Sequence, residues 1–440
     1  MERNVCVIGL GYVGLTLGVY LARQGMNVHG VEISNGVLAS LSQGKAHFYE
    51  KGFDDELKLA IESGKFSFSQ DYKKKDGQVY YIVTVGTPLG QDGRVNLNSL
   101  GSICQNLSEV IKDDDAVILR STVKIGTTRE IVKPILDKSS RKYHLGFCPE
   151  RTLEGVAFEE LSTLPQIVSG IDDTSASVIS RLFEPVSRNL VHLPNVEEAE
   201  MVKLINNSER DLMFALANEI ALMSDAKGLN AYRIIEAANF EYKRSSLKKP
   251  GPVGGPCLEK DPYILTESFI GGSHLPTLFT AGREVNESII EKGLDCFFSR
   301  YLSENENTSP KKIAVLGFAF KGVPPTGDVR GSLVAKVTTK IKNKFPYSEI
   351  HGHDYLANHK DMRHAGAYIA SENIQETLSG ADLAIIQNNH PGYAKEDWDE
   401  LRKLMSESSM IYDFWHQLTP KNGTKITNYF SFGVFNEQKA

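Results

Sequence analysis

The sequence has few of the features that mark nucleic-acid binding, disulfide stabilisation or membrane insertion. Its 440 residues include 49 Lys and Arg against 55 Asp and Glu, so a net charge of −6 leaves no basic surplus for nucleic acid phosphates. The five cysteines are scattered without a CxxC or Cys/His cluster, which argues against zinc and against a disulfide framework. No apolar run is long enough to cross a bilayer. We therefore expect no metal, no nucleic acid and no membrane as partners, and a reducing compartment.

The chain length and composition are typical of a soluble protein with several domains. Apolar residues make up 41% and charged residues 24% of the chain, as in globular proteins. A chain of 440 residues is too long for one ordinary core, so two or three domains are expected. The N-terminus runs directly into the strand-like "NVCVIGLGYVG", so we expect no signal peptide and a cytoplasmic location.

The first part of the chain alternates short apolar runs with amphipathic stretches. This alternation indicates a parallel, doubly wound α/β sheet of the Rossmann-like type, with its ligand site at the carboxyl ends of the strands. We assign it to residues 1–195. The strand-like runs are "NVCVIGL", "NVHGVEI", "VYYIVTVGTP", "DAVILRST" and "HLGFCPE".

The middle and the end of the chain differ from this pattern and from each other. Apolar residues at helical spacing and no proline predict a long helix from about residue 196 to 224. Further stretches with helical spacing follow it, so we expect residues 196–302 to form an all-α domain. The polar "SENENTSPKK" reads as a linker. Residues 303–440 then carry a second set of strands, which predicts a smaller Rossmann-like α/β domain without the full glycine fingerprint.

Residues 9 to 14 form a dinucleotide-binding fingerprint directly after the first strand. In this pattern the first glycine makes a tight turn, the second admits a pyrophosphate, and the third lets helix and strand pack closely. Glu32 ends the second strand, where a carboxylate binds the ribose 2′-hydroxyl and repels a 2′-phosphate, so NAD is favoured over NADP. The alternative without a ligand site is a glycine-rich turn with a surface glutamate. The fingerprint residues are Gly9, Gly11, Tyr12, Val13 and Gly14.

Two further strand ends fit the same cleft. "TVGTP", which contains Thr87, and "RSTV", which contains Thr122, offer hydroxyl groups and backbone donors to the cofactor. A capping or turn role is an equally good reading of either segment.

The loop "KKPGPVGGPCLEKDPY" places Cys257 among glycines and prolines. A thiolate beside a hydride acceptor adds to an aldehyde and makes a thiohemiacetal, which is oxidised to a thioester and hydrolysed to an acid. The alternative for a free cysteine is a small buried hydrophobe. The flanking glycines favour chemistry, because they leave the thiol approachable and bring backbone N–H groups close.

Together these motifs resemble the UDP-glucose/GDP-mannose dehydrogenase family. The resemblance covers essentially the whole chain, through "GLGYVGL", "STV", "PER", "KLINN", "GGPCLEKDP" and "GFAFKG…DVRGS" in order. It implies an NAD-dependent oxidoreductase that converts the 6-hydroxymethyl group of a nucleotide sugar, a UDP-hexose or UDP-N-acetylhexosamine, to a carboxylate for polysaccharide or glycan precursor synthesis. It also implies a homodimer through the long central helix.

The family's catalytic residues carry over to positions in this chain. The nucleophile matches Cys257, and the loop aspartate that handles a proton or positions water matches Asp261. Lys203 and Asn207, one helical turn apart, match the pair that stabilises oxyanion-like intermediates. Thr122 and Glu150 match residues that position water and assist thioester hydrolysis; Glu150 also reads as a salt-bridge partner of Arg151.

Residues that contact the substrate and cofactor carry over in the same way. The resemblance places Lys321 and Arg330 near the substrate's diphosphate and the cofactor. Arg244 resembles the arginine that family members donate across a dimer interface, with a one-residue deletion in its loop. The full substrate-contacting set is Glu150, Arg151, Lys203, Asn207, Arg244, Gly254 and Lys321.

The sequence departs from the family pattern at two places near the sugar and the diphosphate. Pro256 precedes the nucleophile, where acetamido-sugar relatives have His and UDP-glucose or GDP-mannose enzymes tend to have Ser. The stretch between Lys321 and Asp328 is about two residues longer than in many members. Both departures leave the chemistry untouched and leave the sugar open.

Two other functions fit part of the sequence. A two-electron β-hydroxyacid dehydrogenase also joins a dinucleotide domain to helices and uses a helix lysine, but it needs neither the cysteine nor the third domain. An NAD-binding sensor without activity fits the fingerprint alone. The NADH-to-sugar ratio discriminates these hypotheses, because only the four-electron reaction yields two NADH.

Overall fold

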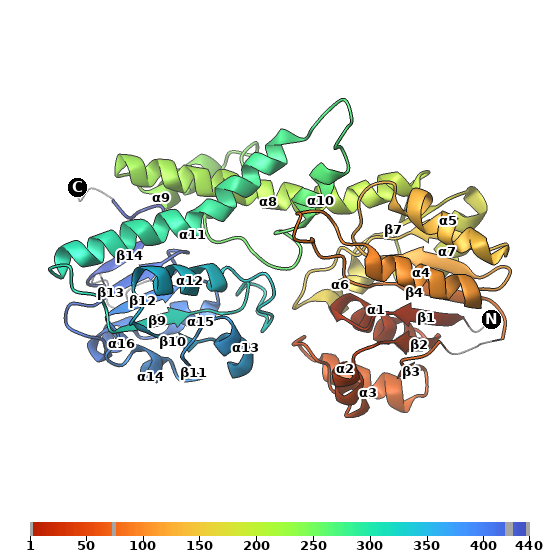
Figure 1. Cartoon of the computed structure of the whole chain (residues 1–440), viewed down its shortest axis with the longest axis horizontal. Coiled ribbons are helices and arrows are strands. Elements are labelled where there is room, and N and C mark those ends of the chain that lie inside the picture. The colour runs from red at the N-terminus through yellow and green to blue at the C-terminus, as the bar shows by residue number, and fades with distance from the viewer. Residues whose placement is uncertain (1–2, 73–75, 419–425, 437–440) are drawn as a thin grey trace. The chain divides into compact units, whose positions relative to one another are not determined.

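The structure is a computed structural model of the chain and describes residues 3–72, 76–418 and 426–436 (Figure 1). The chain folds into two compact units. The first unit combines residues 1–207 with 263–275, and the second combines residues 208–262 with 276–440.

The first unit is built on a sheet in the order β3-β2-β1-β4-β5-β6-β7-β8. The order reverses between β1 and β4, which places a ligand cleft at their carboxyl ends. The pairs are parallel except β6 and β7, which are antiparallel because the connection through α6 returns the chain at the end where β6 stops. The strands are β1 (Asn4–Ile8), β2 (Asn27–Val31), β3 (Phe66–Ser69), β4 (Val79–Val83), β5 (Ala116–Leu119), β6 (His144–Phe147), β7 (Gln166–Gly170) and β8 (Leu190–His192).

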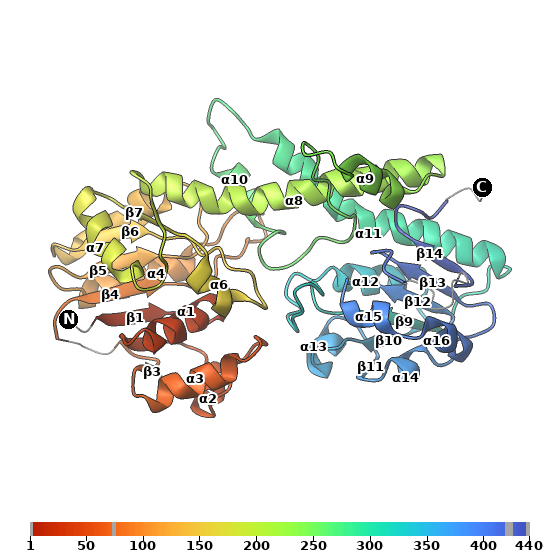
Figure 2. The same cartoon turned by 180° about the vertical axis from the view of Figure 1, so that it is seen from behind.

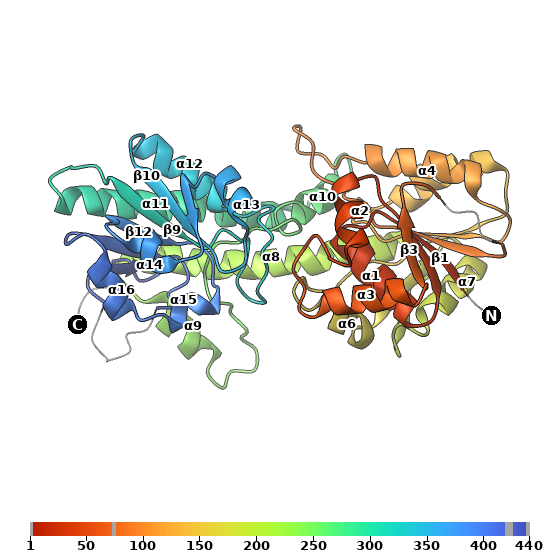
Figure 3. The same cartoon turned by 90° about the horizontal axis from the view of Figure 1, so that it is seen from below.

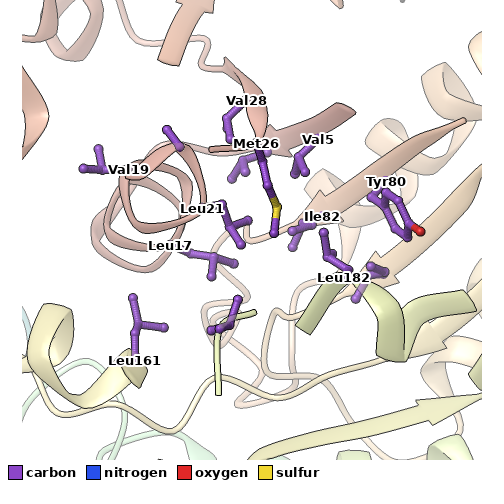
Figure 4. Packing of buried hydrophobic residues seen from close by; sticks show 14 of the residues in the cluster. Val5, Leu17, Val19, Leu21, Met26, Val28, Tyr80, Ile82, Leu161 and Leu182 are labelled. Carbon is purple, nitrogen blue, oxygen red and sulfur yellow. The ribbon is translucent and has the colours of Figure 1, made fainter. Parts of the chain in front are cut away.

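Helices cover both faces of this sheet, as the strand-helix alternation predicts. Alternate strand residues such as Val5 and Ile82 pack against α1, α3 and α7, with Leu17, Leu21 and Leu182 in the same core (Figure 4). The intervening residues pack against α4 and α5 on the other face. The helices are α1 (Tyr12–Arg23), α2 (Asn35–Ser42), α3 (Phe53–Glu62), α4 (Asn98–Val110), a π-helix (Thr127–Val132), α5 (Lys133–Leu136), α6 (Ala157–Thr163) and α7 (Asp173–Phe183).

The middle of the chain is helical, as predicted. The long helix α8 (Val196–Lys227) begins at the expected residue and ends three residues later than expected. It is followed by α9 (Ala231–Asn239), α10 (Asp261–Glu267) and α11 (Thr277–Glu304). The boundary between the two units falls inside α8, after Asn207, and inside α10, after Pro262.

The second unit contains a parallel sheet in the order β11-β10-β9-β12-β13-β14, which repeats the β3-β2-β1-β4-β5-β6 order of the first. On one face pack α11, α12 and α13, and on the other pack α14, α15 and α16 (Figures 2 and 3). The strands are β9 (Lys312–Leu316), β10 (Glu349–His353), β11 (Ile369–Ser371), β12 (Leu383–Ile386), β13 (Met410–Asp413) and β14 (Tyr429–Ser431). The helices are α12 (Val334–Lys344), α13 (His359–His364), α14 (Ile374–Leu378), α15 (Pro391–Lys395) and α16 (Trp398–Leu404). The predicted fold class, two Rossmann-like folds with a helical middle, is confirmed.

Candidate active site

The glycine turn between β1 and α1 has the geometry of a pyrophosphate site. Gly9 has φ +90°, which favours glycine, and a Cβ on Gly14 would lie 1.9 Å from the carbonyl oxygen of Gly9. A Cβ on Gly11 would meet nothing within 4 Å, so this side of the turn is open. The first turn of α1 has no side-chain cap and no acidic residue, which leaves its N–H groups for an anion.

Glu32 stands directly after β2 and is fixed beside this turn. One carboxylate oxygen accepts a hydrogen bond from the N–H of Leu10 at 2.8 Å, and the other accepts from the N–H of Ser34 at 2.9 Å. Each oxygen keeps a second lone pair for a ribose hydroxyl. The carboxylate is therefore oriented by the turn that it would serve.

Two side chains of the cofactor set, those of Tyr12 and Thr87, make hydrogen bonds within the first unit. The hydroxyl of Tyr12 donates to Glu50, and the N–H of Gly155 donates to both at 2.9 Å. The hydroxyl of Thr87 donates to the carbonyl oxygen of Thr122. Tyr12 and Thr87 thus tie neighbouring segments of the first unit together, and Val13 lies in the first turn of α1.

Glu150 forms a buried ion pair with Arg120, a residue to which sequence reasoning gave no role. The Arg120 guanidinium donates to Glu150 at 2.9 and 2.7 Å, to Gln166 at 3.0 Å and to the carbonyl oxygen of Cys148 at 3.2 Å. Burial opposes the ionisation of Glu150, but Arg120, the backbone N–H of Thr152 and the charge of Lys203 together lower its pKa. Glu150 is therefore a carboxylate at neutral pH.

The alternative reading of Glu150 as the salt-bridge partner of Arg151 is wrong. The backbone N–H of Arg151, not its guanidinium, donates to Glu150 at 2.7 Å. The guanidinium of Arg151 donates instead to the carbonyl oxygen of Pro165 at 2.6 Å. The reason is that Glu150 turns toward Arg120 on the neighbouring strand end, where a buried guanidinium would be costly without a paired carboxylate.

The first turns of α8 bring Lys203 and Asn207 into the same unit as Glu150. Both side chains are half-buried and lie one turn apart on the helix. Thr122, half-buried after β5, belongs to the same unit, and Glu200 on α8 holds the following segment through Gly126 and Thr128 at 2.6 to 2.8 Å. The first unit therefore combines an ammonium, an amide and a carboxylate with the cofactor cleft.

Cys257 belongs to the second unit and is exposed in the turn that leads into α10. Its carbonyl oxygen accepts hydrogen bonds from the N–H groups of Lys260 at 3.1 Å and Asp261 at 2.9 Å. The Lys260 ammonium donates to the fully buried Asp261 carboxylate at 2.6 Å. This turn fixes the backbone of the thiol-bearing residue against a buried ion pair.

The glycines before Cys257 allow backbone to pack on backbone. The N–H of Gly255 donates to the carbonyl oxygen of Gly331 at 2.6 Å, and a Cβ on Gly254 would lie 2.4 Å from that oxygen. Gly255 has φ +98°, and a Cβ there would lie 2.5 Å from the ring of Phe320. The Gly255 N–H, which the sequence suggested as a donor near the thiol, is used within the protein.

The remaining residues of the site also lie in the second unit. The Arg330 guanidinium is largely exposed and donates to Asp328 at 2.5 Å. The ammonium of Lys321 lies 5.3 Å from the ring centre of Phe320, and the exposed Arg244 stacks on Tyr242 at 5.0 Å. The predicted site residues thus divide into a cofactor, Lys203 and Glu150 group in the first unit and a Cys257 group in the second.

Comparison with known proteins identifies the family of the chain. Three models of the UDP-glucose/GDP-mannose dehydrogenase family match the chain, namely its NAD binding domain over residues 3–187, its central domain over 197–288 and its UDP binding domain over 314–420. The chain belongs to the UDP-glucose/GDP-mannose dehydrogenase family.

Individual members of the family are similar over almost the whole chain. Two proteins named UDP-N-acetyl-D-mannosamine dehydrogenase are each 30% identical to it. The one from Pyrococcus horikoshii aligns over 93% of this chain and 94% of its own length, and the one from Methanocaldococcus jannaschii over 96% of each. The solved structure of the UDP-D-ManNAc dehydrogenase from Pyrococcus horikoshii superposes with a TM-score of 0.86 at 28% identity, over 99% of this chain and 100% of that one.

Membership of the UDP-glucose/GDP-mannose dehydrogenase family makes the chain an NAD-dependent UDP-sugar dehydrogenase. The open side at Gly11, the uncapped start of α1 and the oriented Glu32 fit NAD. In the part of the chain that the structure describes, no group of His, Cys, Asp and Glu is arranged to hold a metal ion. No helix among the described residues is long and apolar enough to cross a membrane.

Proposed function

We propose that this dehydrogenase oxidises the C6 hydroxymethyl group of a UDP-sugar to a carboxylate in two steps, with Cys257 as the nucleophile. The observation that carries the proposal is the exposed thiol of Cys257 in the turn before α10. Burial raises the pKa of Cys6, Cys104 and Cys148 to about 12, so these three stay protonated and inert. Cys257 is the exposed thiol that belongs to a family motif.

The residues divide the chemistry between them. NAD, when bound, accepts one hydride in each of the two oxidations. The Cys257 thiolate adds to the aldehyde carbon and makes it tetrahedral, and loss of the second hydride leaves a thioester on Cys257. Water then breaks the carbon–sulfur bond and releases the acid and the thiol.

Charged and polar groups of the chain would stabilise these steps. The Lys203 ammonium and the Asn207 amide suit the oxygen on which negative charge develops. Glu150, kept ionised by Arg120, suits a hydrogen-bond acceptor that orients the attacking water together with Thr122. Asp261, paired with Lys260, suits the handling of a proton at the thiol loop.

The residues that we propose for substrate contacts come from both units. We propose Lys321, Arg244 and Gly254 for the sugar nucleotide, with Arg151 beside Glu150, and Arg330 for the cofactor. The sugar is a UDP-N-acetylhexosamine or a UDP-hexose. The names of the two 30% identical relatives make UDP-N-acetyl-D-mannosamine the first substrate to test. Pro256, beside the nucleophile, is the residue expected to influence this choice.

We further propose a cytoplasmic homodimer whose product serves polysaccharide or glycan precursor synthesis. The exposed apolar side chains of Leu216 and Met223 support the dimer, because they are two turns apart on one face of α8. Arg244 would then reach the neighbouring subunit's substrate. The three-domain division into residues 1–195, 196–302 and 303–440 stays part of this proposal.

The test measures NADH formed per sugar across a panel of UDP- and GDP-sugars. Two NADH per acid are expected with the native substrate. Cys257→Ser should stop acid formation, whereas Cys296→Ser, which changes another exposed thiol on α11, should leave it intact. One NADH per sugar, or acid formed at the parent rate by Cys257→Ser, would rule the proposal out.

A further inference from the structure

The side chain of Asn218 hydrogen-bonds both the backbone N–H and the backbone carbonyl of Gly251, at the start of the cysteine loop. Its side-chain nitrogen donates to the carbonyl oxygen of Gly251 at 3.1 Å, and its side-chain oxygen accepts from the N–H of Gly251 at 2.8 Å. Asn218 is fully buried on α8. Gly251 lies in the same loop as Cys257, within the second unit, so a helix side chain fixes the position at which this loop leaves the helical middle.

The Asn218 amide is itself held by a buried polar network between α8 and α11. It donates to the side-chain oxygen of Asn286 at 2.8 Å. Asn286 donates to the backbone and side-chain oxygens of Asp211 at 3.0 and 2.9 Å, and Arg283 donates to the same carboxylate at 2.7 Å. All four side chains are at most 1% exposed. Asn286, which is itself held by Asp211, pairs with the Asn218 amide, and this chain of buried hydrogen bonds orients that amide.

The loop is also fixed between Gly251 and Cys257. A Cβ on Gly251 would lie 2.4 Å from the Trp415 ring, so this backbone packs directly on the indole. The N–H of Gly255 donates a hydrogen bond to the carbonyl oxygen of Gly331 at 2.6 Å. With these two contacts in place, the Asn218 clamp sets the upstream end of a short segment that ends at the thiol.

We propose that Asn218 is a positioning residue for Cys257, which acts through the Gly251 backbone and is oriented by Asn286, Asp211 and Arg283. The inference rests on the proposed function, in which Cys257 adds to the aldehyde. That addition needs the sulfur at bonding distance from the carbon, and a displacement of about 1 Å costs on the order of 100-fold in rate. The first oxidation does not use the thiol, so loss of the clamp slows the second oxidation selectively.

The experiment compares the two oxidations in Asn218→Ala. The full-length enzyme receives NAD and the UDP-sugar that the panel identifies, and mass spectrometry measures aldehyde and acid while absorbance measures NADH. We expect the aldehyde to accumulate, NADH per sugar to fall from two toward one, and KM for the UDP-sugar to change less than about threefold. Asn218→Ser, which leaves a smaller cavity, is used in the same way if Asn218→Ala does not fold.

The matched control is Asp225→Ala, seven residues further along α8. Asp225 also clamps backbone, since it accepts from the N–H groups of Gly433 at 3.0 Å and Phe435 at 2.7 Å, but these belong to the C-terminal segment. It should lower stability and keep two NADH per sugar. Equal aldehyde release from both variants would show a general loss of structure and would overturn the positioning role.

The two hypotheses fail in different ways. If Asn218→Ala still forms two NADH per acid at the parent rate while Cys257→Ser forms no acid, the positioning role is wrong and the proposed function stands. If Cys257→Ser forms acid at the parent rate, the proposed function falls and the inference falls with it.

Discussion

Arg120 and Glu150 form a buried ion pair in which two guanidinium nitrogens donate to one carboxylate oxygen, at 2.9 and 2.7 Å. The Arg120 side chain is fully buried and that of Glu150 is 8% exposed. The pair joins the end of β5 to the segment after β6, beside the predicted water-positioning residue Thr122. It keeps a carboxylate ionised where the proposed hydrolysis needs an acceptor that orients water.

Replacing Arg120 should therefore expose the cost of an isolated buried charge. Arg120→Met is expected to destabilise the protein by about 3–5 kcal/mol, and Arg120→Met with Glu150→Gln should recover part of that loss. Denaturant unfolding measures both. The control, Arg129→Met, breaks the half-exposed pair with Glu197 and should cost at most about 1 kcal/mol. Equal losses in the two single variants would contradict the prediction.

The same pair predicts how stability responds to acid. The pKa of Glu150 is lowered in the folded state, so the unfolded state binds more protons and the Glu150 contribution is present above its unfolded pKa of about 4.3. That contribution is lost as the pH falls through the folded pKa. In Arg120→Met the lowered pKa disappears, so thermal unfolding below pH 4.3 should show a smaller further loss than in the parent protein.

Glu200 predicts the opposite pH dependence. Burial raises its pKa to about 7, against the hydrogen bonds donated by Thr128 and Gly126. The folded state then binds more protons than the unfolded state between about pH 4.5 and 7, so stability falls as the pH rises through this range. Glu200→Gln should remove this dependence and lower stability at pH 5. Glu197→Gln, whose parent carboxyl has a lowered pKa, is the control and should not flatten the curve.

Glu32 predicts the cofactor preference. Glu32→Ala should weaken NAD binding about tenfold, because an ionised acceptor for the ribose hydroxyls is lost, and should narrow the preference for NAD over NADP. Titration calorimetry with both cofactors measures these effects. Glu56→Ala removes an exposed partner of Arg23 in the same unit and should leave both affinities unchanged. Unchanged NAD affinity in Glu32→Ala would show that the ribose lies elsewhere.

The backbone conformation and close packing of Gly255 predict that the cysteine loop does not tolerate a side chain at this position. Gly255→Ala combines a φ of +98° with a Cβ 2.5 Å from Phe320, so we expect a loss of about 2–4 kcal/mol in stability and of most acid-forming activity. Gly271 also has a positive φ, +83°, but a Cβ there would meet nothing within 4 Å, so Gly271→Ala is the control. It should cost about 1 kcal/mol from backbone strain alone. Thermal unfolding and acid formation separate the two.

Local motifs carried much of the prediction. The glycine turn and Glu32 could be read from the sequence because they are consecutive elements of one strand-helix-strand unit, whose geometry is set by backbone sterics and a repeat of hydrophobic residues. The long helix α8 was predictable for the same reason, since its apolar spacing and its lack of proline act within one segment. The cysteine loop stood out because no helix or strand accommodates its glycines and prolines.

Contacts between distant segments were not predictable in this way. The motif "RSTV" alone gives no role for Arg120, and the alternative of an ion pair between Glu150 and Arg151 rests only on their adjacency in the chain. The antiparallel direction of β7 and the reversal between β1 and β4 also depend on how the chain returns to the sheet.

The sequence by itself determined the cofactor turn, the α/β alternation, the central helix and the reactive loop, because each follows from interactions among residues close in the chain. Tertiary structure alone decided that Arg120 neutralises Glu150 and that Asn218 clamps Gly251. These partners are separated by many residues, and they meet because burying a charge or an amide is favourable only where a distant segment supplies its hydrogen bonds.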